Sequence, residues 1–383
     1  MLAFVLACSI LMLSACADSS SSSNKGDSSS SAASTEQSSG TKTASILECT
    51  VSKIDKGNIT LSLKASQLLE TFACGDILSV AFDDKVVDVP LVTSYSDVDS
   101  GAAGIVAREA KDTTVLMTNM GNFAETYGVT ESTSFAVSLK EAGGCLEDLR
   151  MRDQSYTDER SDFSNLSDAE FANFRVVGTT GMGKDVLSGG ASPIDPKHKR
   201  NTYADAAIKD AGVKTILNLS NEEDEAVAFP GYADTHYASV SHIALGMGYD
   251  FASSEFQEKL VRGLRCLTEN ESPYYVHCLE GKDRTGFVAA MLECLMGASY
   301  DEVVADYMET FTNYYGVKPN DARYEYLSQH GIVLSLKKAL GVEDLTSVDL
   351  AYKAEEYLKG IGLTQDEVTA LKAKLSGNGS AAK

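Results

Sequence analysis

A short apolar run, a polar loop and an apolar helix follow one another between residues 273 and 297. The run Pro273–Val276 predicts a buried strand, residues 278–284 a loop, and Thr285–Met296 a helix that ends at Gly297. A strand and a helix joined by one loop are the building unit of sheets that helices cover on their faces. This part of the chain is therefore expected to be an α/β domain.

The segments around this unit continue the alternation of strands and helices. Strands are predicted over Lys214–Asn218 and Ala238–Leu245, and helices over Tyr203–Ala211, Phe251–Leu267, Asp301–Asn313 and Leu350–Leu375. Ser254 and Gln257 are expected to form a capping box at the start of the helix 251–267. The pattern predicts an α/β fold with a central mixed sheet flanked by helices.

The N-terminal half has a short-period apolar pattern instead. Runs separated by Gly, Asp and Asn predict strands at Ile59–Leu63, Ile77–Phe82, Val86–Val89 and Thr114–Met117. They indicate a small β-rich, barrel-like domain. Its segments Asp55–Asn58, Thr93–Asp97 and Gly121–Glu125 resemble the second domain of the bacterial SAM hydroxide adenosyltransferases. That family's catalytic first domain has no counterpart here, so the domain is expected to be a non-catalytic ligand-binding or docking module, or purely structural.

The N-terminus predicts export and anchoring. Residues 1–15 are apolar, and Leu13-Ser14-Ala15-Cys16 resembles the lipobox of bacterial lipoproteins, although no Lys or Arg precedes the apolar run. Lipidation at Cys16 would hold the protein on the outer face of the bacterial cell membrane. An ordinary secretory signal and a core helix are the alternatives.

Composition sets the remaining boundaries. The expected order is a signal peptide (1–15), a Ser-rich flexible tether (16–44), the β-rich domain (45–135), a charged connecting segment (136–165) and the α/β domain (166–377). With 55 acidic and 33 basic residues the net charge is −22, which repels nucleic acid. An anionic substrate therefore requires a local positive site.

Six cysteines remain beyond the N-terminal segment, and their spacing matches no zinc pattern. In an exported protein disulfides are allowed, and Cys49 with Cys74 is one candidate pair because both belong to the first domain. Cys294 lies in an apolar run and is expected to be a buried core thiol.

The loop after the strand 273–276 carries the candidate chemistry. Within His277-Cys-Leu-Glu-Gly-Lys-Asp-Arg-Thr-Gly286, Cys278 and Arg284 lie at the two ends of a seven-residue turn. Backbone N–H groups of such a loop and the N-terminus of the following helix form an anion cradle, and Gly281 permits a tight turn. Arg284 can bind two phosphate oxygens with its planar fork, and the same donors favour a thiolate at Cys278. Thr285 is expected to hydrogen-bond that thiolate, and His277 to orient the loop.

This loop has the C-x5-R-[ST] signature, and the chain resembles the cysteine-based protein tyrosine phosphatases of the dual-specificity branch. Gly281-Lys-Asp-Arg284 is most similar to the bacterial tyrosine and phosphoinositide phosphatases. The resemblance implies hydrolysis of phosphotyrosine, phosphoserine, phosphothreonine or inositol phosphate groups through a phosphocysteine, without metal or cofactor. The implied catalytic residues are Cys278, Arg284, Asp283, Asp250 and Thr285, and the implied substrate-binding residues are His277, Leu279, Glu280, Gly281, Lys282 and Gly286.

Several of these positions leave alternatives open. Lys282 is either a second pocket cation, which would favour highly phosphorylated substrates, or a solvated loop lysine. The general acid is either Asp250, 28 residues before Cys278 in a glycine-rich loop, or Asp283 in the loop itself. Asn173-Phe-Arg175 resembles the opening motif of the family, but Ser188-Gly189 stands where relatives have Tyr-Arg. A non-hydrolytic phospho-ligand binder and a surface adhesin are therefore the competing functions.

Overall fold

The computed structural model describes residues 45–378. Cys16 and the predicted signal and tether lie outside the described residues. Two sheets organise the described part of the chain, one a closed barrel and one with five strands. Among the described residues no helix is both long enough and apolar enough to span a membrane.

The first sheet is a seven-stranded barrel with the strand order β1-β2-β6-β5-β4-β3-β7, which confirms the β-rich, barrel-like prediction. Its elements are β1 (Ile46–Asp55), β2 (Asn58–Leu61), α1 (Ala65–Thr71), β3 (Ile77–Phe82), β4 (Lys85–Val92), β5 (Ala103–Arg108), β6 (Thr113–Thr118), α2 (Phe123–Tyr127) and β7 (Ser134–Glu141). Strand β7 continues beyond residue 135, where the predicted first domain ends. Alternate residues of the strands fill the barrel, as Leu78, Val80 and Phe82 of β3 do.

The second sheet has the order β11-β10-β12-β9-β8, and only β8 is antiparallel to its neighbour. It is the mixed sheet that the sequence predicts. Its strands are β8 (Arg175–Val176), β9 (Leu187–Gly190), β10 (Thr215–Asn218), β11 (Ser241–Ala244) and β12 (Tyr274–His277). The helices are α3 (Leu146–Met151) and α4 (Asp168–Phe171) before the sheet, then α5 (Asn201–Asp210), α6 (Glu223–Val227), α7 (His236–Ser239), α8 (Ser254–Glu269), α9 (Asp283–Met296), α10 (Tyr300–Tyr315), α11 (Ala322–Ser328), α12 (Leu334–Leu340), α13 (Leu350–Gly360) and α14 (Gln365–Leu375).

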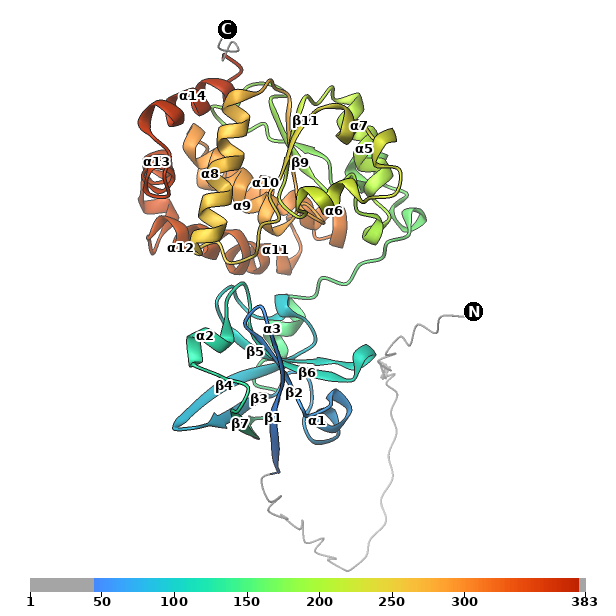
Figure 1. The fold of residues 1–383 in the computed structure, drawn as a ribbon, viewed down its shortest axis with the longest axis vertical. Helices are drawn as coiled ribbons and strands as arrows, with labels where there is room; N and C mark the ends of the chain where they lie inside the picture. The colour runs from blue at the N-terminus through green and yellow to red at the C-terminus, as the bar shows by residue number, and fades with distance from the viewer. Residues whose placement is uncertain (1–44, 379–383) are drawn as a thin grey trace, which may run out of the picture. The chain divides into compact units, whose positions relative to one another are not determined.

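Helices cover both faces of this sheet, with α8, α9, α13 and α14 on one side and α5 and α7 on the other (Figure 1). Strand β12 serves both cores because successive side chains of a strand point to opposite faces. Tyr274 and Val276 pack into the larger core, and Tyr275 packs into the smaller one. Both cores hold β12 in place, and β12 leads directly into Cys278.

Several element boundaries differ from the sequence-based expectation by a few residues, and residues 350–375 form two helices, α13 and α14. Helix α9 begins at Asp283 rather than Thr285, so its first turn includes Arg284. The predicted strand 238–245 is shorter because Thr235 caps a short helix, α7, before it. The capping box at Ser254 is wrong, since the N-cap of α8 is Ser253, whose hydroxyl accepts from the Phe256 N–H.

Candidate active site

Three consecutive carbonyl groups of the loop between β12 and α9 point outward and are held by neighbouring segments. The Ser192 N–H donates to the Leu279 oxygen at 3.0 Å. Asn173 Nδ2 donates to the Glu280 oxygen at 2.9 Å, and Arg175 Nη1 donates to the Gly281 oxygen at 3.2 Å. By contrast, the backbone N–H groups of residues 279–282 donate to no acceptor in the described part of the chain. With its carbonyls engaged outside, the loop leaves these N–H groups free for an anion beside the N-terminus of α9.

Gly281 is the residue that makes this loop geometry possible. Its φ is +79°, which residues with a side chain rarely adopt. A Cβ at this position would lie 2.4 Å from the carbonyl carbon of Gly190 in β9. The loop therefore packs against β9 backbone to backbone, and only glycine fits there.

Cys278 and Arg284 lie at the two ends of the loop. The Cys278 side chain is buried, with 3% of its surface exposed. Arg284 Nη1 donates to the carbonyl oxygens of Leu219 (3.1 Å) and Met247 (2.9 Å), and Nη2 donates to the Tyr249 hydroxyl at 2.8 Å. Its Nε is buried and has no hydrogen-bond partner within residues 45–378. Arg284 thus has an unused donor, which is costly to bury unless a ligand accepts from it.

His277 precedes Cys278, and Thr285 follows Arg284. Burial lowers the pKa of His277 to about 4, so the ring is neutral at pH 7. Its Nδ1 donates to the Cys278 carbonyl oxygen at 3.0 Å, a contact that fixes the ring beside the loop. The Thr285 hydroxyl is buried and has no partner among the residues described. Gly286, in contrast, uses its backbone N–H inside α9, where it donates to the Lys282 carbonyl.

The two candidate acids have different surroundings. Burial raises the pKa of Asp283, the first residue of α9, and the nearby cations only partly oppose this. A carboxyl of that kind keeps its proton to higher pH than an ordinary aspartate. The Asp250 carboxylate instead accepts from the Ala252 N–H at 3.1 Å within its own turn. Asp250 follows Tyr249, which brings its loop close to Arg284.

Lys282 is not a solvated lysine, since only 9% of its surface is exposed. Its ammonium donates to Gln154 Oε1 at 3.0 Å and to the Tyr315 hydroxyl at 3.1 Å, and it lies 3.6 Å from Glu280 Oε2. Burial disfavours its charged form, but electrostatic interactions with Asp283, Tyr315 and Glu280 outweigh that, so its pKa is raised well above the ordinary value. Lys282 therefore contributes a fixed positive charge at the edge of the loop.

A protein-family model describes much of the chain that forms this site. The model of the tyrosine phosphatase family matches residues 169–377, more than half of the chain. The chain belongs to the tyrosine phosphatase family. It is accordingly a phosphoric monoester hydrolase of the tyrosine phosphatase type, and the matched range contains every residue of the loop described above. No curated protein sequence matches the chain significantly.

Solved structures share limited similarity with this phosphatase. The core catalytic domain of the PP-IP phosphatase SIW14 from S. cerevisiae is 18% identical, covers 44% of this chain and 94% of its own, and has a TM-score of 0.26. TpbA from P. aeruginosa is 21% identical over 41% of this chain and 88% of its own, also with a TM-score of 0.26. An uncharacterized protein from Thermotoga maritima is 18% identical over 24% of this chain, with a TM-score of 0.23. This phosphatase covers 35% of the Thermotoga protein's length.

A second layer of residues supports the loop of the phosphatase. Arg175 holds the Gly281 carbonyl, and Asp306 of α10 accepts from Arg175 Nε at 3.3 Å. Gly189 lies beside this pair, because a Cβ there would be 3.7 Å from Arg175 Cζ. The Tyr-Arg pair expected from the resemblance is absent, since the chain has Ser188 and Gly189 there, and Arg175 lies next to Gly189.

The sequence did not indicate Tyr249, Gln154, Tyr315 or Asp306 as neighbours of the loop. Gln154 belongs to the connecting segment, and Tyr315 and Asp306 belong to α10, so their contacts join distant parts of the chain. Tyr249 did carry a signal, since it is an aromatic residue in a glycine-rich loop next to the candidate acid Asp250.

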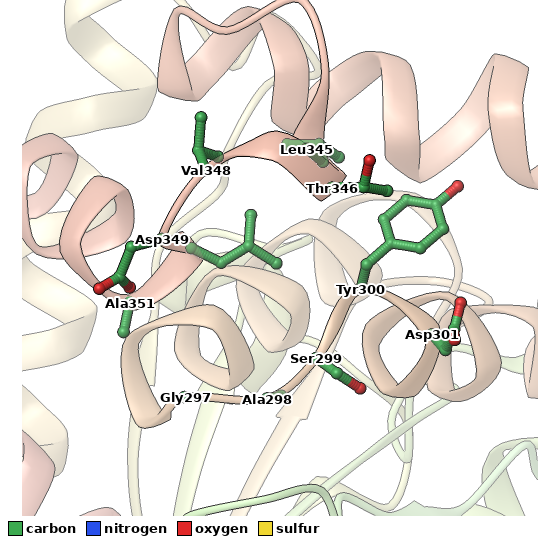
Figure 2. A pocket seen from close by; sticks show the side chains of 11 residues that line it. Gly297, Ala298, Ser299, Tyr300, Asp301, Leu345, Thr346, Val348, Asp349 and Ala351 are labelled. Atoms are coloured by element: carbon green, nitrogen blue, oxygen red, sulfur yellow. The ribbon is translucent and has the colours of Figure 1, made fainter.

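The structure has a cavity beside the loop and another far from it. The first, of about 610 Å³, is bordered by Gln154, Tyr156, Glu280, Lys282 and Tyr315 among other residues. The second, of about 390 Å³, lies between residues 297–301 and 345–351 (Figure 2). It adjoins the C-terminal end of α9, opposite the end that carries Arg284, and so is separate from the candidate site. No group of three or more metal-binding side chains occurs among the described residues.

Proposed function

We propose that the chain hydrolyses phosphomonoesters through a phosphocysteine intermediate at Cys278. The observation that carries the proposal is the set of unused donors in the loop that follows this buried thiol. The N–H groups of residues 279–282 and the Nε of Arg284 have no acceptor within residues 45–378. Donors arranged in this way stabilise the oxygens of a phosphoryl group during its transfer.

The proposed reaction has two displacements. The Cys278 thiolate attacks phosphorus, an S–P bond forms, and the P–O bond to the leaving group breaks as that oxygen receives a proton. Water then attacks phosphorus, the S–P bond breaks, and inorganic phosphate and the thiolate are released. The unpartnered Thr285 hydroxyl is available to donate to that thiolate. Division into two displacements lowers the barrier of each.

We assign the proton donor to Asp283. Its raised pKa favours the protonated form that a general acid needs at the start of the reaction. Asp250 is the alternative donor, and one oxygen of its carboxyl, Oδ1, accepts from the Ala252 N–H within its own turn. If Asp283 is the donor, its substitution should slow hydrolysis of substrates with poor leaving groups, whereas substitution of Asp250 should not.

The substrate class is proposed to be phosphotyrosine, with phosphoserine, phosphothreonine and phosphoinositides as further candidates. The cavity of about 610 Å³ beside Glu280 and Lys282 provides room for the group that carries the phosphate. In the unliganded site Lys282 donates to Gln154 and Tyr315, so a second phosphate must compete with these two contacts. A comparison of phosphotyrosine peptide with soluble inositol phosphates separates the candidates.

We also propose that the enzyme acts outside the bacterial cell, anchored through lipidated Cys16. The support is the lipobox-like segment Leu13–Cys16, which lies outside the described residues. Membrane fractionation of the full chain beside Cys16→Ser tests the anchor. The serine variant is expected in the soluble or uncleaved precursor fraction, and unchanged membrane association of a mature Cys16→Ser protein would contradict the anchor.

Hydrolysis of para-nitrophenyl phosphate tests the proposed activity. The experiment compares residues 45–378 with the Cys278→Ser variant, each with and without EDTA. Activity that persists in EDTA and disappears in the variant is the expected result. A folded variant that retains the activity would refute a role for the thiol, and loss of activity in EDTA would point to a metal-dependent reaction.

A further inference from the structure

Two segments that are distant in sequence are tied together at one end of the barrel. Residues 73–76 precede β3, and residues 143–146 lead into α3. The Gly75 carbonyl accepts from the Cys145 N–H at 2.9 Å and lies 3.3 Å from the Cys145 Sγ. The carboxylate of Asp76 bridges both segments, because it accepts from the N–H groups of Ala73 and Gly143, each at 2.8 Å.

These contacts bring the segment that contains Cys74 next to Cys145, since Cys74 lies between Ala73 and Gly75. The two thiols also share their charged neighbours. The pKa of each is raised first by burial and then by nearby carboxylates, and Asp76 and Asp97 act on both. Cys74 itself contributes to the pKa of Cys145, which is raised to about 11.

We propose that Cys74 and Cys145 form a disulfide when the chain is exposed to an oxidant. The four backbone and side-chain contacts fix the two segments without any covalent link, and they hold Cys145 beside Gly75, the residue that follows Cys74. Because α3 leads to Gln154, the bond secures the end of the connecting segment that approaches Lys282.

A disulfide compound serves as the oxidant that forms the Cys74–Cys145 bond. One thiolate attacks a sulfur of the oxidant, and a mixed disulfide forms. The second thiolate then attacks the protein sulfur of that mixed disulfide, so that the oxidant leaves as two thiols that have taken up two electrons and two protons. The bond does not depend on the proposed activity. In the cell the oxidant would be a thiol–disulfide oxidoreductase outside the cytoplasm, and in the laboratory oxidised glutathione replaces it.

Cys49 is the alternative partner for Cys74, and the structure favours Cys145. Cys49 lies in β1 opposite Phe135 of β7, buried in the core of the barrel. Burial alone raises its pKa to about 11, with no contribution from Cys74. No hydrogen bond joins the Cys49 side chain to residues 73–76 in the described part of the chain. We therefore propose the pair Cys74–Cys145 in preference to the pair Cys49–Cys74 that the sequence suggests.

The test uses the full chain in detergent with Cys278→Ser, which removes the thiol proposed to be reactive. The reduced protein is incubated with oxidised glutathione, the remaining thiols are alkylated, and peptides are mapped without reductant. A cross-linked pair of peptides containing Cys74 and Cys145 is expected. The link should persist in Cys49→Ser and disappear in Cys74→Ser and in Cys145→Ser. It should form faster at pH 8.5 than at pH 6.5, because both thiols have raised pKa values.

Thermal unfolding provides a second readout. A disulfide that closes a long loop restricts the unfolded chain, so the oxidised protein should unfold several degrees above the reduced protein. The double variant Cys74→Ser/Cys145→Ser should unfold at one temperature under both conditions. Alkylation of both thiols after oxidation, or a link between Cys49 and Cys74, would overturn the proposal.

Discussion

The hydroxyl of Tyr249 accepts a hydrogen bond from Arg284 Nη2 at 2.8 Å, and the Tyr249 ring centre lies 4.3 Å from the Arg284 Cζ. The tyrosine is 45% exposed, so it covers the proposed phosphate-binding arginine from the solvent side. A phosphate that uses Nε and Nη2 must share or displace this hydroxyl. Tyr249 therefore competes with the substrate for one donor of the fork.

Tyr249→Phe removes the competing acceptor and keeps the ring. We expect the inhibition constant for inorganic phosphate to fall about two- to tenfold, corresponding to one hydrogen bond. Tyr249→Ala, which also removes the ring, is the matched comparison, because it should lose the cation–π contact as well. Weaker phosphate binding by the phenylalanine variant would show that the hydroxyl assists the ligand instead of competing with it.

Asp283→Asn should have an effect that depends on the leaving group. A para-nitrophenolate leaves without a proton, whereas an alkoxide needs one, so we expect a loss of about 10²- to 10⁴-fold in kcat for alkyl phosphates and a much smaller loss for the aryl ester. Asp250→Asn is the control and should show no such selectivity. The reverse pattern between the two variants would assign the acid to Asp250.

The raised pKa of Asp283 also predicts the shape of the pH profile. A general acid is active while protonated, so the rate with alkyl phosphates should fall as the pH rises through that raised pKa. The ordinary pKa of an aspartate is about 3.9, so the decline should occur at a higher pH than that. It should be missing from the profile of Asp283→Asn. The same decline in the asparagine variant would mean that another group causes it.

Gly281→Ala tests the close approach of the loop to β9. The added Cβ would lie 2.4 Å from Gly190, and the positive φ adds backbone strain. We expect loss of activity and a free energy of unfolding lower by about 1 to 3 kcal/mol or more. Gly297→Ala is the matched control, because Gly297 also has a positive φ but no atom lies within 4 Å of its added Cβ. Equal effects of the two variants would attribute the loss to strain alone.

Glu293 makes a prediction about stability and pH. It is fully buried in α9, its carboxylate has no hydrogen-bond partner among residues 45–378, and burial followed by repulsion from Asp306 raises its pKa well above the ordinary value. The unfolded chain releases this proton near the ordinary pKa, whereas the folded chain retains it. The stability associated with the protonated carboxyl is therefore complete below the unfolded pKa and declines as the pH rises toward the folded one. Glu293→Gln should remove this decline.

Glu302 is the control, because its pKa is lowered in the folded protein whereas that of Glu293 is raised. Hydrogen bonds from Ser299 and Thr180 lower its pKa to about 2. Its contribution to stability is present above the unfolded pKa and is lost as the pH falls toward about 2, so Glu302→Gln should change stability on the acid side. Chemical denaturation between pH 3 and 8 measures both variants. A Glu293→Gln protein that keeps the wild-type decline at higher pH would contradict the buried protonated carboxyl.

The sequence predicts individual helices, strands and loops better than it predicts contacts between segments that are distant along the chain. The unit 273–296 was recognisable because its predicted strand is apolar and Gly297 ends its helix, and Gly297 is the C-cap of α9 in the structure. The strands β1, β5 and β7 were not predicted. Each of them is stabilised by pairing with strands elsewhere in the barrel, which the local sequence does not show. The contact of Gln154 with Lys282 spans 128 residues and left no local pattern in either segment. The residues of the loop, and Asn173 and Arg175 that hold two of its carbonyls, could thus be named in advance, whereas Gln154 and Tyr315 could not.

Detection of the covalent intermediate tests the central claim most directly. Residues 45–378 would be mixed with para-nitrophenyl phosphate, quenched in acid during turnover, and digested for mass spectrometry. One phosphoryl group is expected on the peptide that contains Cys278, and none on the corresponding peptide of Cys278→Ser. A phosphoryl group on another residue, or steady turnover by the Cys278→Ser variant, would contradict the claim.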